Sequence, residues 1–273
     1  MTDSPWRLAH AAAAAAGVEL RRLRSLEDCD RILEVMIATW GNTQLVPREM
    51  LRALGESGNV PYGAFDEDRL VGYVLGWVGV DESGLHVHSH MLAALPERRH
   101  RGVGYALKLA QRARALDQGI HVARWTFDPL VARNAYLNLE KLSAIADGFH
   151  RDFYGEMTDT LNVGDRSDRL VVRWDLDREP RETEPPEAGD LPIVLGRGMG
   201  ERPEPGPPPA PSGAVVEIPP DRAELRRVVP DSAAEWRDAA ADAIESCLGA
   251  GLVAAAFDRA RSAYFFLPEK VPA

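Results

Sequence analysis

Arginines and glycines with the spacing of a phosphate-binding loop stand at residues 99–104, which read Arg-His-Arg-Gly-Val-Gly. Glycine lets the backbone approach a phosphate closely and adopt conformations closed to other residues. Free N–H groups at the start of a helix attract anions, and arginine adds donors that match phosphate geometry. Because a strand-like run precedes this stretch and a helical pattern follows it, the sequence predicts a pyrophosphate-binding loop. A tight turn without a ligand is the alternative.

Three histidines, His86, His88 and His90, alternate with other residues just before the loop. A period of two places all three on one face of a strand, and an imidazole can accept a proton near neutral pH. We therefore predict His90 or His88 as a general base. One alternative is a polar face that packs under a helix or against another subunit. Another is a metal site completed by a carboxylate such as Asp128.

Residues 94–104, which read Ala-Leu-Pro-Glu-Arg-Arg-His-Arg-Gly-Val-Gly, resemble the acyl-CoA signature of the GNAT superfamily of N-acetyltransferases. The resemblance covers roughly residues 18–176. It implies an α/β (α+β) fold in which a mixed, mostly antiparallel sheet has splayed central strands and flanking helices. It also implies acetyl-CoA or another acyl-CoA as co-substrate, with its pantetheine arm between the splayed strands.

The loop and the resemblance together assign acyl-CoA binding to ten residues. These are Leu92, Ala94, Arg99, Arg101, Gly102, Val103, Gly104, Tyr105, Asn134 and Asn138. The backbone N–H near Leu92 or Ala94 is where the resemblance implies stabilisation of the oxyanion. Asn134 and Asn138 lie four apart on one helix face, where either can bond the pantetheine amides; Asn134 is alternatively a helix cap.

The chain departs from the family at the end of the helix that follows the fifth strand. Many members have a Tyr-x-x-x-Gly-Phe pattern there, whose tyrosine protonates the leaving thiolate. Residues 139–144 read Leu-Glu-Lys-Leu-Ser-Ala instead. Tyr136 and Tyr154 are candidate replacements, against the alternative that each is a half-buried core tyrosine. Asp128 is a candidate base or substrate-orienting carboxylate, against the alternative of an Asp-Pro turn.

The composition limits the partners of the chain. Its 273 residues carry a formal net charge of −10, which argues against general nucleic-acid binding. No apolar run is long enough to span a membrane. The two cysteines, Cys29 and Cys247, form no Cys-x-x-Cys motif. We therefore expect a cytoplasmic protein that binds neither nucleic acid nor membrane, and a homodimer is left open.

Residue patterns predict the elements that position these side chains. Strands are expected at 18–23, 62–65, 70–80, 85–95, 121–127, 149–157 and 168–176, and helices at 26–39, 47–55, 105–119 and 131–142. Asp231 is expected to cap an amphipathic helix before strands at 252–257 and 263–267.

The composition changes along the chain and suggests three parts. We predict a GNAT-like acyl-CoA-binding domain at 1–178, a Pro/Glu-rich linker or long loop at 179–212, and a small C-terminal α/β extension at 213–273 packed on the first domain. The segments 126–130, 162–164 and 167–169 resemble a GNAT branch with a C-terminal extension, from which no substrate carries over.

These observations predict a GNAT-type N-acyltransferase that moves an acetyl group from acetyl-CoA directly to an amine on a small-molecule acceptor. Because the usual tyrosine is absent, the first alternative is a catalytically weak or inactive module that binds or senses acyl-CoA. The second alternative is a metal-dependent hydrolase or decarboxylase that uses the histidine strand.

Overall fold

A computed structural model of the chain describes residues 5–42, 46–59, 61–82, 84–99, 101–157, 164–180 and 186–269. His100 and residues 162–163, both part of motifs discussed above, lie outside these ranges. The chain divides into two compact units. The first comprises Met1–Trp125, Thr158–Val163 and Asp175–Arg178, and the second comprises Thr126–Met157, Gly164–Trp174 and Glu179–Ala273. The division at Trp125 differs from the expected boundary at residue 178, because residues 126–157 and 164–174 pack with the C-terminal part of the chain.

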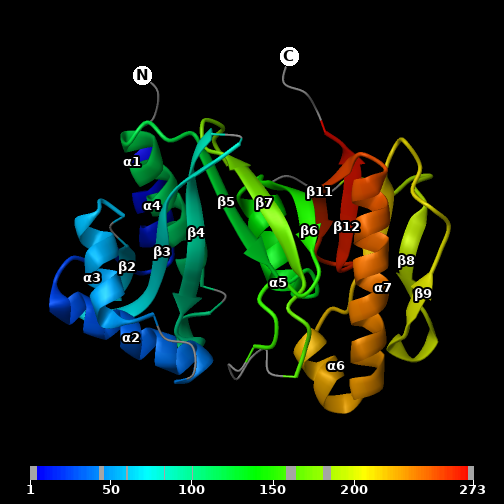
Figure 1. The fold of residues 1–273 in the computed structure, drawn as a ribbon, viewed down its shortest axis with the longest axis horizontal. Coiled ribbons are helices and arrows are strands. Elements are labelled where there is room, and N and C mark those ends of the chain that lie inside the picture. Colours follow the sequence, from blue (N-terminus) through cyan, green and yellow to red (C-terminus); the bar gives the residue numbers. More distant parts are fainter. Residues whose placement is uncertain are drawn as a thin grey trace. The chain divides into compact units, whose positions relative to one another are not determined.

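The first unit contains strands in the order β1-β2-β3-β4-β5 (Figure 1). Their bounds are β1 Glu19–Arg22, β2 Tyr62–Asp66, β3 Arg69–Asp81, β4 Gly84–Ala94 and β5 Val122–Phe127, whose last two residues belong to the second unit. Neighbours pair antiparallel from β1 to β4, and β4 pairs parallel with β5. The predicted mixed and mostly antiparallel α/β fold is confirmed.

Four helices pack on these strands. They are α1 Pro5–Ala15, α2 Leu26–Trp40, α3 Arg48–Glu56 and α4 Val103–Asp117. Ser25 caps α2: its side chain accepts a hydrogen bond from the N–H of Asp28, whose carboxylate accepts one from the N–H of Ser25. Helix α1 packs along α4, where the Trp6 indole donates to Asp117 (2.8 Å). The apolar sides of the four helices share one core with β2, β3 and β4.

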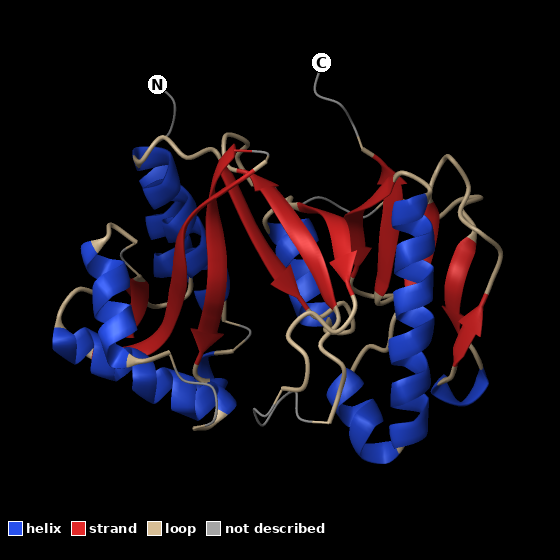
Figure 2. Cartoon of the chain, in the orientation of Figure 1, coloured by secondary structure: helices blue, strands red, loops and turns tan. Residues whose placement is uncertain are grey.

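The second unit contains strands in the order β7-β6-β11-β12-β10-β8-β9 (Figure 1). Their bounds are β6 Ile145–His150, β7 Arg169–Asp175, β8 Ile193–Arg197, β9 Pro203–Pro205, β10 Ala214–Glu217, β11 Leu252–Asp258 and β12 Ala263–Pro268. The helices are α5 Ala132–Ala135, the π-helix η2 Tyr136–Lys141, α6 Arg222–Val228 and α7 Pro230–Gly249 (Figure 2).

Helix α7 presents the apolar face that the sequence predicts. Trp236, Ala240, Ile244 and Cys247 are buried. The predicted cap is wrong, because the helix begins one residue before Asp231, at Pro230, whose fixed φ suits a first helical position.

Three other expectations need correction. The stretch expected as a solvated linker contributes β8 and β9, because Val194 and Leu195 are apolar and are buried against β10. The strand expected at 149–157 ends at His150, and the chain turns at Asp152 and Gly155, which have positive φ. The helix expected at 131–142 changes from α to π at Tyr136.

Candidate functional site

The two central strands of the first unit part after a short parallel ladder. Val87 pairs with Ala123 and His88 with Arg124, and these are the pairs that join β4 to β5 in the described residues. Strand β4 continues for six more residues, to Ala94, paired only with β3. The predicted splay therefore begins at Ser89.

Strand β4 presents backbone groups along this open edge that do not bond β3. The Leu95 N–H donates to the Val71 carbonyl (2.9 Å), so residue 95 faces β3. Backbone groups alternate in direction along an antiparallel pair, and the register has no irregularity between 91 and 95. The N–H and C=O groups of Leu92 and Ala94 therefore point away from β3. An extended ligand with amide groups can pair with such an edge as an added strand does.

The predicted phosphate loop leads from this edge into α4. It contains one 3₁₀ turn, Pro96–Arg98, and it ends at Gly102, the residue before the helix. Gly102 has φ 85° in the left-handed region, which a residue with a Cβ adopts only at a cost. The N-cap residue Gly102 has no side chain that could cap α4, and the first turn has no acidic residue. Because N–H groups at a helix start carry a partial positive charge, the residues present fit the diphosphate of CoA.

The arginines of the loop have different surroundings. Arg98 forms an ion pair with Asp66. Arg99 donates from Nε to the Ala94 carbonyl (3.4 Å), so its side chain lies at the open edge. Arg101 is exposed and has no carboxylate within ion-pair distance among the described residues. Val103 is buried, whereas Gly104 and Tyr105 are half-buried at the start of α4, so the start of the helix is anchored through Val103.

His88 and His90 form a cluster with Trp77. The ring of His88 stacks on Trp77 at 5.0 Å, His90 lies 4.8 Å from the same indole, and the two imidazoles are 5.9 Å apart. Desolvation and the neighbouring cationic groups lower the pKa of His88 to about 4, and desolvation also lowers the pKa of His90. Both imidazoles are therefore neutral at pH 7, and His88, with a pKa of about 4, is a weak base.

A β-bulge and its exposure distinguish His90 from the other two histidines of the strand. Leu75 pairs with Met91 and Gly76 with Ser89, so His90 is the extra residue of a β-bulge. A bulge re-aims the side chain that it carries. His90 is exposed, whereas His86 is buried beside Gly79 with its Nδ1 3.7 Å from an Asp81 carboxylate oxygen. Of the two predicted bases, His90 is exposed and His88 is half-buried, so His90 is the more accessible to a substrate.

A buried lysine lies on the opposite face of β4. Lys108 of α4 is 2% exposed. Its Nζ donates to Ser89 Oγ (2.8 Å) and lies 3.5 Å from the ring centroid of Trp125 on β5. Desolvation holds the pKa of Lys108 well below its usual 10.5. From the sequence alone Lys108 is most simply a solvated helix residue, and the structure corrects that interpretation; the signal was its place among four apolar residues, Ala106, Leu107, Leu109 and Ala110.

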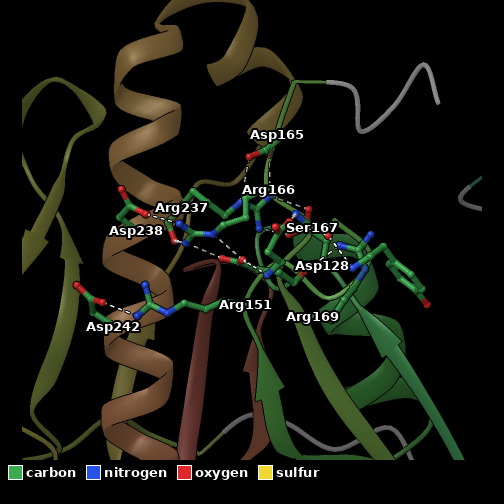
Figure 3. Close-up of polar contacts among 12 residues, drawn as sticks. Asp128, Arg151, Asp165, Arg166, Ser167, Arg169, Arg237, Asp238 and Asp242 are labelled. Atoms are coloured by element: carbon green, nitrogen blue, oxygen red, sulfur yellow. Dashed lines mark hydrogen bonds and ion pairs between the residues drawn. The ribbon is translucent and has the colours of Figure 1, made fainter. Parts of the chain in front are cut away.

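Asp128, predicted as a base or an orienting carboxylate, belongs to a buried ionic network of the second unit (Figure 3). Arg237 donates to both of its oxygens (2.8 and 2.9 Å), and Arg222 donates to one of them (3.1 Å). Asp165 accepts from Arg237 (2.8 Å) and pairs with Arg222. Although burial alone raises the pKa of Asp128, the two guanidinium groups lower it to about 2. Such a carboxylate is a weak base, and its bond from the Leu130 N–H is that of an Asp-Pro turn.

The remaining predicted residues also belong to the second unit. Asn138 is buried on the π-helix and Asn134 is half-buried one turn earlier. Tyr154 is 44% exposed, its N–H donates to Ser167 Oγ (2.9 Å), and the Arg169 guanidinium lies 5.3 Å from its ring. Tyr136 is half-buried, with the Arg259 guanidinium 5.1 Å from its ring.

The histidine strand does not form a metal-ligand set in the described ranges, where no group of three His, Cys, Asp or Glu side chains is placed to hold a metal ion. Within the same ranges, no helix combines the length and the apolar character needed to span a membrane.

A comparison with protein families finds a match over part of the chain, from the first unit into the beginning of the second. Residues 22–138 match the model of the acetyltransferase (GNAT) family. No curated protein sequence matches the chain.

The chain is also similar to solved acetyltransferase structures. The ribosomal-protein-S18-alanine N-acetyltransferase of Escherichia coli has 11% identity and a TM-score of 0.49, with 61% of this chain and 99% of that chain covered. Arabidopsis thaliana NAA60, in complex with a bisubstrate analogue, has 15% identity and a TM-score of 0.47, with 58% and 98% covered. Ard1 from Thermoplasma volcanium has 14% identity and a TM-score of 0.44, with 58% and 97% covered.

Proposed function

Since residues 22–138 form an acetyltransferase domain of the GNAT family, we propose that the chain transfers an acyl group from acetyl-CoA or a related acyl-CoA directly to an amine. One observation carries the proposal: the uncapped start of α4 lies at the end of a strand whose far edge is open from Ser89 onward. These are the two features that an acyl-CoA needs, an anion site and an edge that pairs with amides.

The first unit provides a binding path for the donor. The N–H groups at the start of α4 hold the diphosphate, and Arg99 and Arg101 add positive charge beside it. The N–H and C=O groups of Leu92 and the N–H of Ala94 pair with the amides of the pantetheine arm. One N–H of this edge also donates to the thioester oxygen as negative charge develops on it, which lowers the barrier to attack.

His90 is the general base. The acceptor ammonium first loses one proton to solvent. The neutral imidazole of His90 then takes the second proton as the amine nitrogen attacks the thioester carbon. The C–N bond forms and the C–S bond breaks, so no covalent intermediate with the protein is needed. Trp77 and His88 hold the imidazole of His90 at the bulge by ring contacts.

The acceptor is a small cationic amine. The chain carries a formal net charge of −10, and a negative field raises the encounter rate with cations. The acceptor approaches on the face of β4 that carries Trp77 and His90, where aromatic rings favour contact with an ammonium group.

A titration of the protein with acetyl-CoA, followed by calorimetry, tests the donor site. Arg101→Glu places a negative charge at the start of α4 and is expected to weaken binding at least about tenfold. Arg24→Glu, an equal change of charge at another exposed arginine of the first unit, is the matched control and should bind as the wild type does. Equal affinity of all three proteins would contradict the proposed site.

Release of free CoA thiol in the presence of a panel of polyamines, amino acids and aminoglycosides tests the transfer. We expect amine-dependent release that falls about 10²–10⁴-fold in His90→Gln, the usual contribution of a general base. Tight binding of acetyl-CoA without release by any amine would instead identify an acyl-CoA sensor.

A further inference from the structure

We propose that Lys108 donates the proton that the CoA sulfur takes up when the C–S bond breaks. The proposal rests on the proposed function and names a residue of the same site that faces the sulfur. Thioester aminolysis needs such a donor, because a thiolate released into a site shielded from water is a poor leaving group.

Lys108 lies where the two central strands separate. Its ammonium nitrogen contacts Ser89 on β4 and Trp125 on β5. Ser89 is the first residue of β4 beyond the parallel ladder, which ends at the pair His88–Arg124. The side chain of Lys108 therefore extends from α4 to the point where β4 and β5 begin to separate.

The length of β4 places the sulfur at the same level. The diphosphate site lies just beyond Ala94. Ser89 pairs with Gly76 and Ala94 with Gly72, so the two levels are four residue steps apart along β3, about 13 Å. An extended pantetheine arm spans a distance of this order. A donor whose phosphates lie at the start of α4 and whose arm follows β4 thus brings its thioester close to Ser89.

Two proton-transfer groups flank this level of the strand. His90 and Lys108 belong to opposite faces. The ring of His90 contacts Trp77 and His88, whereas Lys108 bonds Ser89, which neighbours His88 in the regular part of the strand and points to the other side. A thioester between them has a base on one side, for the attacking amine, and an acid on the other, for the departing sulfur.

Burial prepares Lys108 for this role. No carboxylate lies within ion-pair distance of Lys108 in the described ranges, and Ser89 is its hydrogen-bond acceptor. Arg112, one turn later on α4, instead donates from Nε to the Leu176 carbonyl (2.8 Å). Because burial lowers the pKa of Lys108, its ammonium group gives up a proton to sulfur more readily than an exposed lysine does.

The step conserves atoms and charge. As the C–S electron pair moves onto sulfur, an N–H bond of the Lys108 ammonium breaks and an S–H bond forms. The products are free CoA thiol and a neutral lysine amine. His90 holds the proton from the acceptor amine, and exchange with solvent restores both groups.

The test measures the acidity of the CoA thiol bound to the intact protein, from the ultraviolet absorbance of its thiolate between pH 6 and 10. Desulfo-CoA, which has no thiol, supplies the baseline and confirms donor binding independently. A Lys108 ammonium beside the sulfur favours the thiolate, so the thiol pKa should be about 1–2 units lower in the complex than in free CoA. An unchanged pKa in the wild-type complex would overturn the proposal.

Variants connect the shift to this residue. Lys108→Met keeps the length of the side chain but cannot donate, and the thiol pKa should return to the free value or above while desulfo-CoA still binds. Lys141→Met, at a lysine of the second unit, should leave the shift in place. Should Lys108→Met fail to fold, Ser89→Ala, which keeps the lysine but removes its acceptor, should alter the shift. A variant shift equal to that of the wild type would overturn the proposal.

The outcomes separate this proposal from the proposed function. If desulfo-CoA does not bind the wild type, the donor site itself is wrong. If desulfo-CoA binds and the thiol pKa is unchanged, the donor site stands and the role of Lys108 is wrong.

Discussion

Both units bury charged side chains, but they do so in opposite ways. In the second unit, Asp128 and Arg237 form a bidentate pair, and Asp165 and Arg222 complete the network. In the first unit, Lys108 is equally buried but bonds only a serine hydroxyl and an indole face in the described ranges. In the second unit, buried charges of opposite sign neutralise one another. In the first unit, the buried ammonium of Lys108 has no such partner in the described ranges, and its pKa is lowered.

This difference separates structural from chemical roles. A buried carboxylate held by two guanidinium groups keeps its charge over the whole physiological pH range, so it orders α6, α7 and the loop after β5. A buried amine with few partners costs folding free energy when it is charged. That cost accounts for its lowered pKa and is useful where a proton must move.

Breaking the balanced network should have the largest effect on stability. Arg237→Met leaves Asp128 buried with only part of its compensation, and we expect the free energy of unfolding to fall by about 3–5 kcal/mol, measured by denaturant titration. Arg151→Met, which removes the exposed pairs with Asp242 and Glu245 (2.6 and 2.7 Å), should cost no more than about 1 kcal/mol. Similar losses in both variants would remove the distinction between buried and exposed pairs.

Replacing Lys108, the buried lysine without a carboxylate partner in the described ranges, should raise stability instead of lowering it. We expect Lys108→Met to raise the free energy of unfolding at pH 7 by about 1–3 kcal/mol, because an apolar side chain of similar length replaces a costly amine. The pKa of Lys108 is lower in the folded chain than its unfolded value of 10.5, so the unfolded state binds more protons between the two values. Wild-type stability should therefore rise with pH through that window, and the rise should be absent in the variant. A loss of stability at pH 7 would show that the ammonium is well compensated.

His88 should make the stability of the folded chain depend on pH in the acidic range. Its pKa is about 4 in the folded chain and 6.5 when unperturbed, so the unfolded state binds more protons between these values. Stability should fall as pH decreases from 6.5 to 4, and His88→Gln should reduce that fall by about 1–2 kcal/mol. Thermal unfolding at a series of pH values measures the difference. Parallel curves for the two proteins would contradict the lowered pKa.

The smallest effect is expected at the loop glycine. Gly102→Ala forces a Cβ into the left-handed region, which should cost about 1 kcal/mol. Gly55→Ala, in the last turns of α3 with open space around its Cβ, should instead stabilise by about 0.5–1 kcal/mol. Equal effects at both glycines, measured by denaturant titration, would show that the backbone at Gly102 does not need the left-handed conformation.

Short sequence patterns predicted much of the secondary structure of the first unit. The alternating run that contains the histidines predicted β4, and the glycines and arginines predicted a loop that leads into a helix. The burial of Lys108 could not be predicted from the sequence, because it depends on which face α4 turns toward β4 and β5. Helical periodicity identifies the buried face only when polar residues line the opposite one. In α4 most positions from Val103 to Ala115 are buried.

The second unit was less predictable because its contacts are distant in sequence. Asp128 and Arg237 are 109 residues apart, so neither chain segment indicates the other. The π-helix at Tyr136–Lys141 breaks the 3.6-residue period, which a search for amphipathic helices assumes. The Pro-rich stretch concealed β8 because two buried residues, Val194 and Leu195, give too short an apolar signal.

Residue-resolved amide hydrogen exchange, with and without acetyl-CoA, locates the bound donor on the chain. The amides of Leu92 and Ala94 and those at the start of α4 should become protected on binding. The Leu95 amide, already bonded to Val71, should change little. Protection confined to the second unit, or no change along β4 despite saturating acetyl-CoA, would contradict an acyl-CoA site on the open edge of this strand.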